Sequence, residues 1–244
     1  MTEPASSNIP ITLLFVLFTV LSPRAIFISP DNLFVFLATE AEFAIIAIAV
    51  GILMVAGEFD LSVGAVLAFC SLTFVRAYDA GLGAALALLI SVAVGMAVGF
   101  LNGIITVKAQ IPSFITTLGG LMMWRGITLF WSGGQQAGFD VEKIPVLYKV
   151  IGGARFGFIP VQFIWLVGLT LVAIFFMHAH KTGNWVTVTG DNRLAAKAMG
   201  ISTLRIKLLA FAMGASFGGV SGAMFSAFQG FVSPESFILM ESIV

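Results

Sequence analysis

Residues 82–107 read LGAALALLISVAVGMAVGFLNGIITV and contain no charged side chain. A helix needs roughly 20 mostly apolar residues to cross the hydrocarbon core of a bilayer, and this stretch is long enough. A strand of a transmembrane barrel would be shorter and would alternate apolar with polar residues, which this stretch does not. The sequence therefore predicts a membrane-spanning helix here.

The composition of the whole chain agrees with this prediction. Of its 244 residues, 59% are hydrophobic and 10% are charged, whereas soluble domains carry roughly 25% charged residues. The 12 basic residues balance the 12 acidic ones, so no net positive charge attracts a nucleic acid. The single cysteine, Cys70, lies in an apolar run and is expected to be a small buried hydrophobe. Composition thus excludes a secreted disulfide scaffold, a soluble enzyme and a nucleic-acid binder that relies on net charge.

Further apolar runs follow the same pattern and are separated by charged residues, Pro and Gly. We expect an all-α membrane protein, a polytopic transmembrane helical bundle of about seven helices that forms one domain over residues 1–244. An eighth apolar segment covers residues 237–244, too few to cross a bilayer, so we expect the chain to be a C-terminally truncated fragment of a longer one. The further runs lie at 9–28, 33–56, 61–76, 111–131, 158–180 and 208–231.

Basic residues in short loops indicate which side of a membrane protein faces the cytoplasm. They gather in the longest polar stretch, 178–207, which we therefore expect to be cytoplasmic. Counting back six crossings places the N-terminus in the cytoplasm and the loop 132–157 outside. The basic residues of the stretch are Lys181, Arg193, Lys197, Arg205 and Lys207.

Two sets of glycines, each spaced four residues apart, predict close helix packing. On a helix this spacing forms a smooth stripe that another backbone can approach closely. We expect both stripes to be seams between helices. They are Gly95, Gly99 and Gly103 in one run, and Gly214, Gly218 and Gly222 in another.

Several charged side chains fall within or beside apolar runs. A charge at the bilayer centre costs at least about 2.5–3.5 kcal/mol, so such groups usually face a protein interior and pair. For Arg125, the alternatives are an interface anchor beside Trp124 and a pathway residue paired with a carboxylate. For Asp60, an N-cap of the helix that follows is favoured over a residue bordering a ligand path.

The segment 190–201, GDNRLAAKAMGI, predicts a short helix outside the membrane. Asp191 or Asn192 can cap it, and Gly200 can supply its left-handed end. A helix this short is marginal alone, so we expect it to dock on a partner. The sequence contains no Walker A, Gly-x-Ser-x-Gly or His-Glu-x-x-His motif, and we expect no catalytic residue, metal or cofactor.

The same segment resembles the coupling-helix signature of permease subunits of bacterial ABC importers, in the ribose-type monosaccharide branch. The block GEFDLSVG at 57–64 is similar to that branch's Gly-Gly-Ile-Asp-Leu-Ser-Val-Gly, with Glu58 and Phe59 as departures. VSPESF at 232–237 is instead similar to the related branched-chain amino acid permeases. Further matching blocks, in the family's order, are 101–108, 111–119 and 124–126.

The resemblance implies a multi-pass subunit of the bacterial inner membrane, a transporter rather than an enzyme. It would form the translocation path for a small solute, with a monosaccharide expected and a branched-chain amino acid as the alternative. The implied partners are cytoplasmic ABC ATPase subunits, a second permease subunit (an identical copy or a paralogue), an external solute-binding protein and the lipid bilayer.

In such importers ATP binding closes the ATPase pair, and the short helix transmits that motion to the bundle. The residues implied in coupling are Gly190, Asp191, Asn192, Arg193, Leu194, Ala195, Ala196 and Gly200. Our candidates for the translocation path are Glu58, Asp60, Asn102 and Arg125.

A competing class is an ion-coupled secondary transporter that uses Glu40, Glu42 or Asp60 as a proton or sodium site. Intramembrane carboxylates favour this class. The coupling-like helix disfavours it.

Overall fold

The computed structural model describes residues 9–138 and 148–233. Among these residues, four helices are long and apolar enough to cross a membrane, which confirms the expected all-α membrane protein. Two further helices, α3 (Val63–Asp79) and α5 (Ser113–Ser132), pack beside them. The predicted start of an eighth helix at 237–244 lies outside the described residues. The four long helices are α2 (Pro30–Val55), α4 (Ala84–Ala109), α7 (Val161–Ala179) and α10 (Thr203–Gln229).

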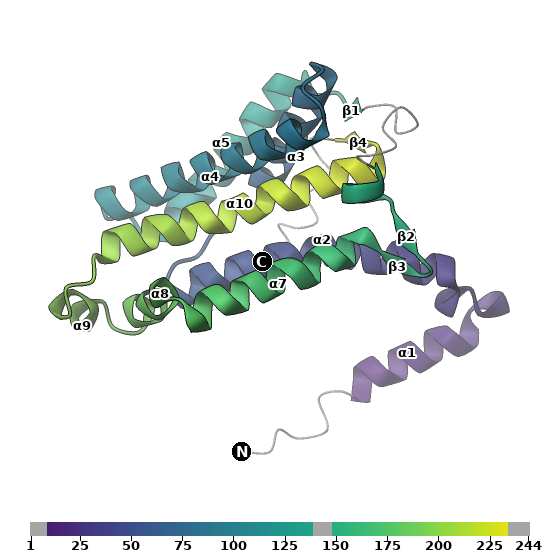
Figure 1. The fold of residues 1–244 in the computed structure, drawn as a ribbon, viewed down its shortest axis with the longest axis horizontal. Coiled ribbons are helices and arrows are strands. Elements are labelled where there is room, and N and C mark those ends of the chain that lie inside the picture. The colour runs from purple at the N-terminus through teal and green to yellow at the C-terminus, as the bar shows by residue number, and fades with distance from the viewer. Residues whose placement is uncertain (1–8, 139–147, 234–244) are drawn as a thin grey trace.

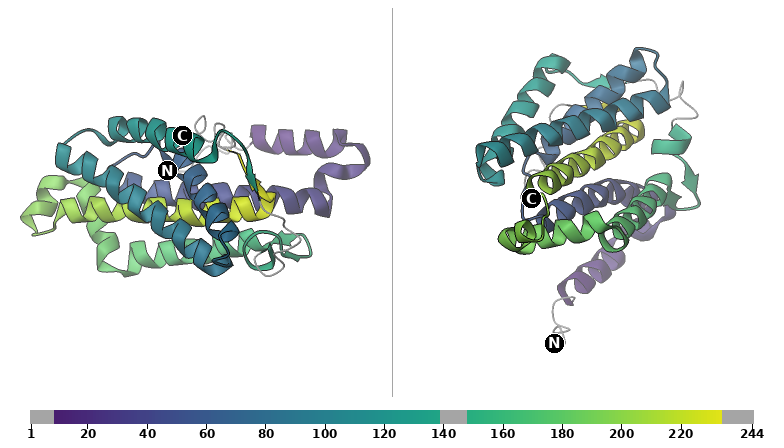
Figure 2. Two further views of the ribbon diagram at one scale, coloured as in Figure 1. Left: turned by 90° about the horizontal axis from the view of Figure 1, so that it is seen from above. Right: turned by 60° about the vertical axis from the view of Figure 1, so that its left-hand side comes forward.

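Helix α10 lies in the middle of the bundle. Figure 1 shows α3, α4 and α5 on one side of it and α2 and α7 on the other, and Figure 2 gives the same arrangement from two further directions. The helices α8 (Lys181–Asp191) and α9 (Arg193–Ala198) lie at one end of the bundle (Figure 1). The other end carries η3 (Tyr148–Gly152) and two antiparallel strand pairs, β1 (Ala137–Gly138) with β4 (Phe231–Val232) and β2 (Arg155–Phe156) with β3 (Ile159–Pro160).

The first helix is shorter than the predicted run 9–28. Helix α1 ends at Leu21, and a 3₁₀ helix, η1 (Pro23–Ile28), follows it. Proline disfavours the helical conformation in the residue before it, and Ser22 is extended at φ −72° and ψ 122°. A single helix over 9–28 is therefore wrong. Helix α1 (Ile9–Leu21) projects from the bundle beside η1 (Figure 1).

Glycines let α4 and α10 approach until their backbones touch. A Cβ atom on Gly95 would overlap the carbonyl oxygen of Ala215. A Cβ atom on Gly99 would overlap the carbonyl oxygen of Phe211. A Cβ on Gly103 would lie 3.1 Å from the Phe211 Cβ. The predicted seam on α4 is thereby confirmed.

The predicted stripe on α10 is only partly correct. A Cβ on Gly222 would lie 2.8 Å from the carbonyl oxygen of Leu67 on α3, so this position requires glycine. Gly214 and Gly218 have ordinary space around them, with nearest atoms at 3.6 and 3.8 Å. Gly219 makes the close contact with α4 instead. Because α10 packs against α3 and α4 at once, its tight positions lie on two adjoining faces rather than on one stripe.

Serine hydroxyls also join the helices. Ser91 of α4 donates to the carbonyl oxygens of Cys70 and Gly219, both at 3.0 Å. Ser71 of α3 donates to the carbonyl oxygen of Gly222 at 2.5 Å. Interhelical hydrogen bonds of this kind stabilise helix packing in lipid. Cys70 is fully buried at this junction, as expected.

The α4–α10 seam can be tested with a matched pair of alanine variants. We expect Gly99→Ala to lower stability by about 1–3 kcal/mol, because the new methyl group must push the two helices apart. Gly119→Ala is the control, since a Cβ there would meet nothing within 4 Å. Thermal unfolding of the purified protein in detergent measures both, and equal midpoints would contradict the seam.

Candidate functional site

A break between α2 and α3 places irregular backbone inside the bundle. Gly57 has φ +76°, a left-handed conformation that glycine adopts without strain. The residues that follow Gly57 are buried, since Glu58, Asp60 and Ser62 are only 8%, 5% and 0% exposed.

Two hydroxyl groups of α5 hold this break in place. The Phe59 N–H donates to Ser113 Oγ and the Leu61 N–H donates to Thr117 Oγ1, both at 3.0 Å. Non-helical backbone at membrane depth is stable only where protein or trapped water satisfies its polar groups. Helix α5 supplies those partners here.

Asp60 orders the last turn before α3. Its Oδ1 accepts hydrogen bonds from the Ser62 N–H at 2.8 Å and from the Ser62 Oγ at 2.6 Å. Ser62, not Asp60, occupies the N-cap position of α3. The predicted N-cap role of Asp60 is therefore wrong, and its carboxylate instead forms a local turn with the residue two positions on.

Asn102 extends these bonds to two more helices. Its Nδ2 donates to Ser62 Oγ at 2.9 Å, and its Oδ1 accepts from Trp124 Nε1 at 3.3 Å. Asn102 is 1% exposed. We call Asp60, Ser62, Asn102 and Trp124 the polar network. It joins the break, α4 and α5.

The structure thus brings together two of the four predicted path residues, Asp60 and Asn102. Ser62 and Trp124 were missed as site residues, although both lie in the sequence blocks that carry the family resemblance. Arg125 follows Trp124 on α5 and is half-buried. Its role as interface anchor or pathway residue stays a prediction.

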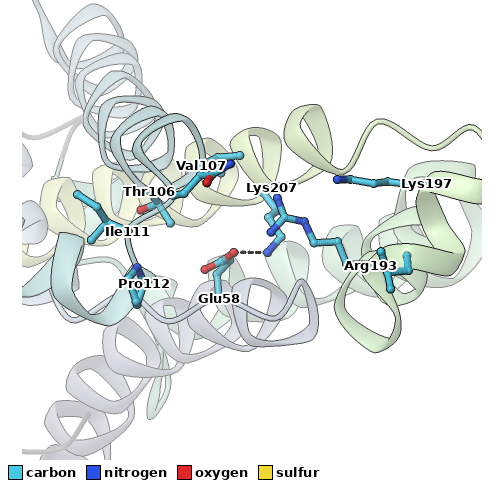
Figure 3. Close-up of a pocket in the computed structure, with 10 residues that line it drawn as sticks. Glu58, Thr106, Val107, Ile111, Pro112, Arg193, Lys197 and Lys207 are labelled. Atoms are coloured by element: carbon cyan, nitrogen blue, oxygen red, sulfur yellow. Dashed lines mark hydrogen bonds and ion pairs between the residues drawn. The ribbon is translucent and has the colours of Figure 1, made fainter.

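Glu58, the fourth predicted path residue, belongs to a different site. It forms an ion pair with Lys207, in the second turn of α10, and each of the two side chains is 10% exposed. Figure 3 shows this pair in a cavity that Arg193 and Lys197 of α9 also line. Lys207 was missed, because its partner lies 149 positions away in the sequence.

Helix α9 is the predicted short helix. Asn192 caps it, since its Oδ1 accepts from the N–H groups of Leu194 and Ala195 at 3.0 Å each. Gly200, at φ +77°, supplies the left-handed end. Ala196 is fully buried, whereas Leu194 is 79% exposed.

Asp191 does not cap α9. It is the last residue of α8, a helix that the sequence analysis did not predict. His180 caps α8, because its Nδ1 accepts from the Thr182 N–H at 3.2 Å. This imidazole cap is the local signal that sequence analysis overlooked.

A backbone contact joins α8 to the break. A Cβ atom on Gly190 would overlap the carbonyl oxygen of Val55, and one on Gly57 would lie 3.3 Å from the Gly190 Cα. Gly190 thus holds α8 against the end of α2 and is not part of α9. The contact therefore lies beside the segment that leads to the polar network.

These features define a multi-pass helical membrane protein with a polar, irregular segment buried in its bundle, an arrangement found in membrane transporters. The chain belongs to the family described as branched-chain amino acid transport system / permease component, which matches residues 32–244. Members of this family are permease subunits rather than enzymes.

Relatives of the chain include sugar-type import permeases. The xylose/arabinose import permease protein of Sulfolobus acidocaldarius is 32% identical over 203 residues, which are 80% of this chain and 55% of the relative. The autoinducer 2 import system permease proteins of Yersinia enterocolitica and Yersinia pseudotuberculosis are 33% and 31% identical over 190 residues, 77% of this chain and 51% and 52% of theirs. The chain spans about half the length of the curated relatives it matches.

Two variants at Asp60 separate its hydrogen bonding from its charge. We expect Asp60→Asn to unfold near the wild-type temperature, because an amide oxygen still accepts from Ser62. Asp60→Ala leaves two buried donors without a partner and should cost about 1–3 kcal/mol. Thermal unfolding in detergent measures both variants. If Asp60→Asn is as unstable as Asp60→Ala, the negative charge and not the hydrogen bond is what matters.

Proposed function

We propose that this chain is the membrane-spanning subunit of an ABC importer and forms the translocation path for a small solute. In this proposal residues 1–244 act as one transmembrane domain, and separate subunits hydrolyse ATP. The observation that carries the proposal is α9, a capped helix that is exposed except for Ala196 and lies beyond the ends of the long helices. Family membership supports it independently.

The exposed face of α9 suits an ATPase partner. Leu194 and Met199 are 79% and 60% exposed, although they lie outside the apolar spans. A helix of six residues is marginal without tertiary contacts, and a protein partner would cover these apolar groups. The ABC ATPase subunit is the partner that the family implies.

Movement of α9 can reach the path through contacts already described. Asn192 joins α9 directly to α8, and Gly190 of α8 packs on Gly57 at the break. The break carries Asp60 and Ser62, whose bonds continue to Asn102. Closing of the ATPase pair would shift this connected set and alternate the access of the path, as a change between two packed states.

A monosaccharide is the proposed solute. The relatives in Sulfolobus and Yersinia are named for import of xylose/arabinose and of autoinducer 2. A neutral polar group such as Asn102 suits a hydroxyl-rich solute better than the carboxylate of an amino acid, whereas Gln110 is exposed at the end of α4. The family's description, which refers to branched-chain amino acids, names the alternative solute.

The proposed orientation places α8 and α9 in the cytoplasm, because the polar stretch 178–207 is rich in basic residues. The end that carries β1 and β4 would then face outward and receive an external solute-binding protein. A second permease subunit would complete the path. The bacterial inner membrane is the proposed location.

An ion-coupled transporter is the second candidate, and Glu42 is the observation that favours it. The Glu42 side chain is buried, and its Oε1 has no hydrogen-bond partner among the described residues. Glu40 is exposed and Asp60 is engaged by Ser62, so neither adds support. Family membership and the exposed α9 favour the importer.

A charge on the outer face of α9 tests the ATPase contact. We expect Leu194→Glu to fold normally but to reduce co-purification with a co-expressed ABC ATPase subunit at least about tenfold, since a buried unpaired charge is unfavourable. Leu82→Glu is the control, because Leu82 is also exposed, at 45%, but lies in the turn between α3 and α4. Equal retention of the ATPase by both variants would contradict the docking role of α9.

Transport in proteoliposomes tests solute and energy source together. The permease, its ATPase and its binding protein would be reconstituted and supplied with labelled xylose or labelled leucine. We expect xylose uptake that requires ATP. The ATP must be on the side of the vesicle membrane where the ATPase subunits lie. ATP-dependent leucine uptake would overturn the sugar assignment. Uptake driven by a proton or sodium gradient without ATP would overturn the importer.

A further inference from the structure

A cavity of about 510 Å³ lies between α9 and the nearby ends of the long helices. Its walls come from the break, the last turns of α4, the turn that leads to α5, α9 itself and the first turns of α10. The polar network does not line it. The cavity therefore lies at the level where the spans end, which is where lipid headgroups lie in a bilayer.

The cavity carries excess positive charge. Lys207, Arg193 and Lys197 line it, and Glu58 is the one carboxylate among its lining residues. Glu58 already pairs with Lys207. Neither Arg193 nor Lys197 has a side-chain partner among the described residues. Within the described part of the chain, these two positive charges have no counter-charge.

The Arg193 side chain extends into the cavity. Figure 3 shows the Arg193 side chain reaching from α9 towards the Lys207–Glu58 pair. The planar guanidinium offers several N–H donors that match the oxygens of a phosphate group, and a lysine adds a point charge. Arg193 and Lys197 are exposed, so an anion can reach them from solvent, and Lys207 adds a buried positive group to the same cavity.

The remaining lining is mixed, since Thr106 and Gln110 are polar and four residues are apolar. The apolar residues are Val107, Ile111, Pro112 and Leu194. A ligand that fits both walls has an anionic group at one side and a hydrocarbon part at the other. Basic pockets between helices at a membrane surface bind anionic lipid headgroups in this manner.

We propose that this cavity binds a phosphate group, supplied by an anionic phospholipid headgroup or by free phosphate, and so connects α9 to α4 and α10. This proposal rests on the proposed function only in treating α9 as the helix that docks on the ATPase. The site itself needs no ATPase, solute or binding protein.

Binding to the purified chain in detergent tests the proposal. The probes are short-chain phosphatidylglycerol, short-chain phosphatidylcholine and inorganic phosphate, each at constant ionic strength, with the rise in the unfolding temperature as the readout. We expect phosphatidylglycerol or phosphate to stabilise the wild type more than phosphatidylcholine does. Stabilisation by phosphatidylglycerol alone assigns the site to lipid, and an equal effect of phosphate assigns it to the free anion.

Matched variants locate the binding. The double variant Arg193→Gln with Lys197→Gln should weaken the apparent affinity at least about tenfold, because two charge-assisted contacts are lost. Arg205→Gln is the control, since Arg205 is an exposed basic residue near the start of α10 that does not line the cavity. Lipid retention in native mass spectrometry gives a second readout that does not depend on unfolding.

Two results would overturn the proposal. One is an equal effect of phosphatidylglycerol and phosphatidylcholine with no effect of phosphate. The other is an unchanged affinity in the double variant. Neither result bears on the importer, which instead fails if Leu194→Glu keeps its ATPase.

Discussion

The backbone contact between α4 and α10 fixes the geometry on which the other parts of the bundle depend. Lipid tails are as apolar as the side chains they surround, so moving an apolar side chain from lipid into the bundle gains little free energy. Helices in a membrane therefore associate through close packing and hydrogen bonds. Gly95 and Gly99 allow that packing, and Ser91 adds bonds to both α3 and α10. Helix α10 also packs on α2, so it is the helix that α2, α3 and α4 all contact.

This arrangement allows irregular backbone to exist inside the membrane protein. The break at residues 56–62 would expose unsatisfied N–H groups in lipid. Because α5 packs on α3, its Ser113 and Thr117 hydroxyls accept two of those groups. The polar network is therefore a consequence of the helix packing.

The break also separates two kinds of chemistry that are only two residues apart in the sequence. Asp60 bonds to Ser62 and through it to Asn102, inside the bundle. Glu58 instead pairs with Lys207 in the cavity beside α9. Glu58 departs from the block that carries the family resemblance, and its ion pair with Lys207 places a charged contact next to α9.

The sequence by itself determined the membrane class, the long spans, the glycine seam on α4 and the short helix that Asp191 or Asn192 could cap, because each depends on a local pattern of hydrophobicity, spacing or capping. Tertiary structure decided the rest. The partner of Lys207 lies 149 positions away, and Asp60 forms a turn where a cap was expected. On α10 the tight positions are Gly219 and Gly222, because two neighbouring helices contact adjoining faces. Contacts between distant segments arise from how the helices cross, and that crossing is not encoded in any short stretch of the chain.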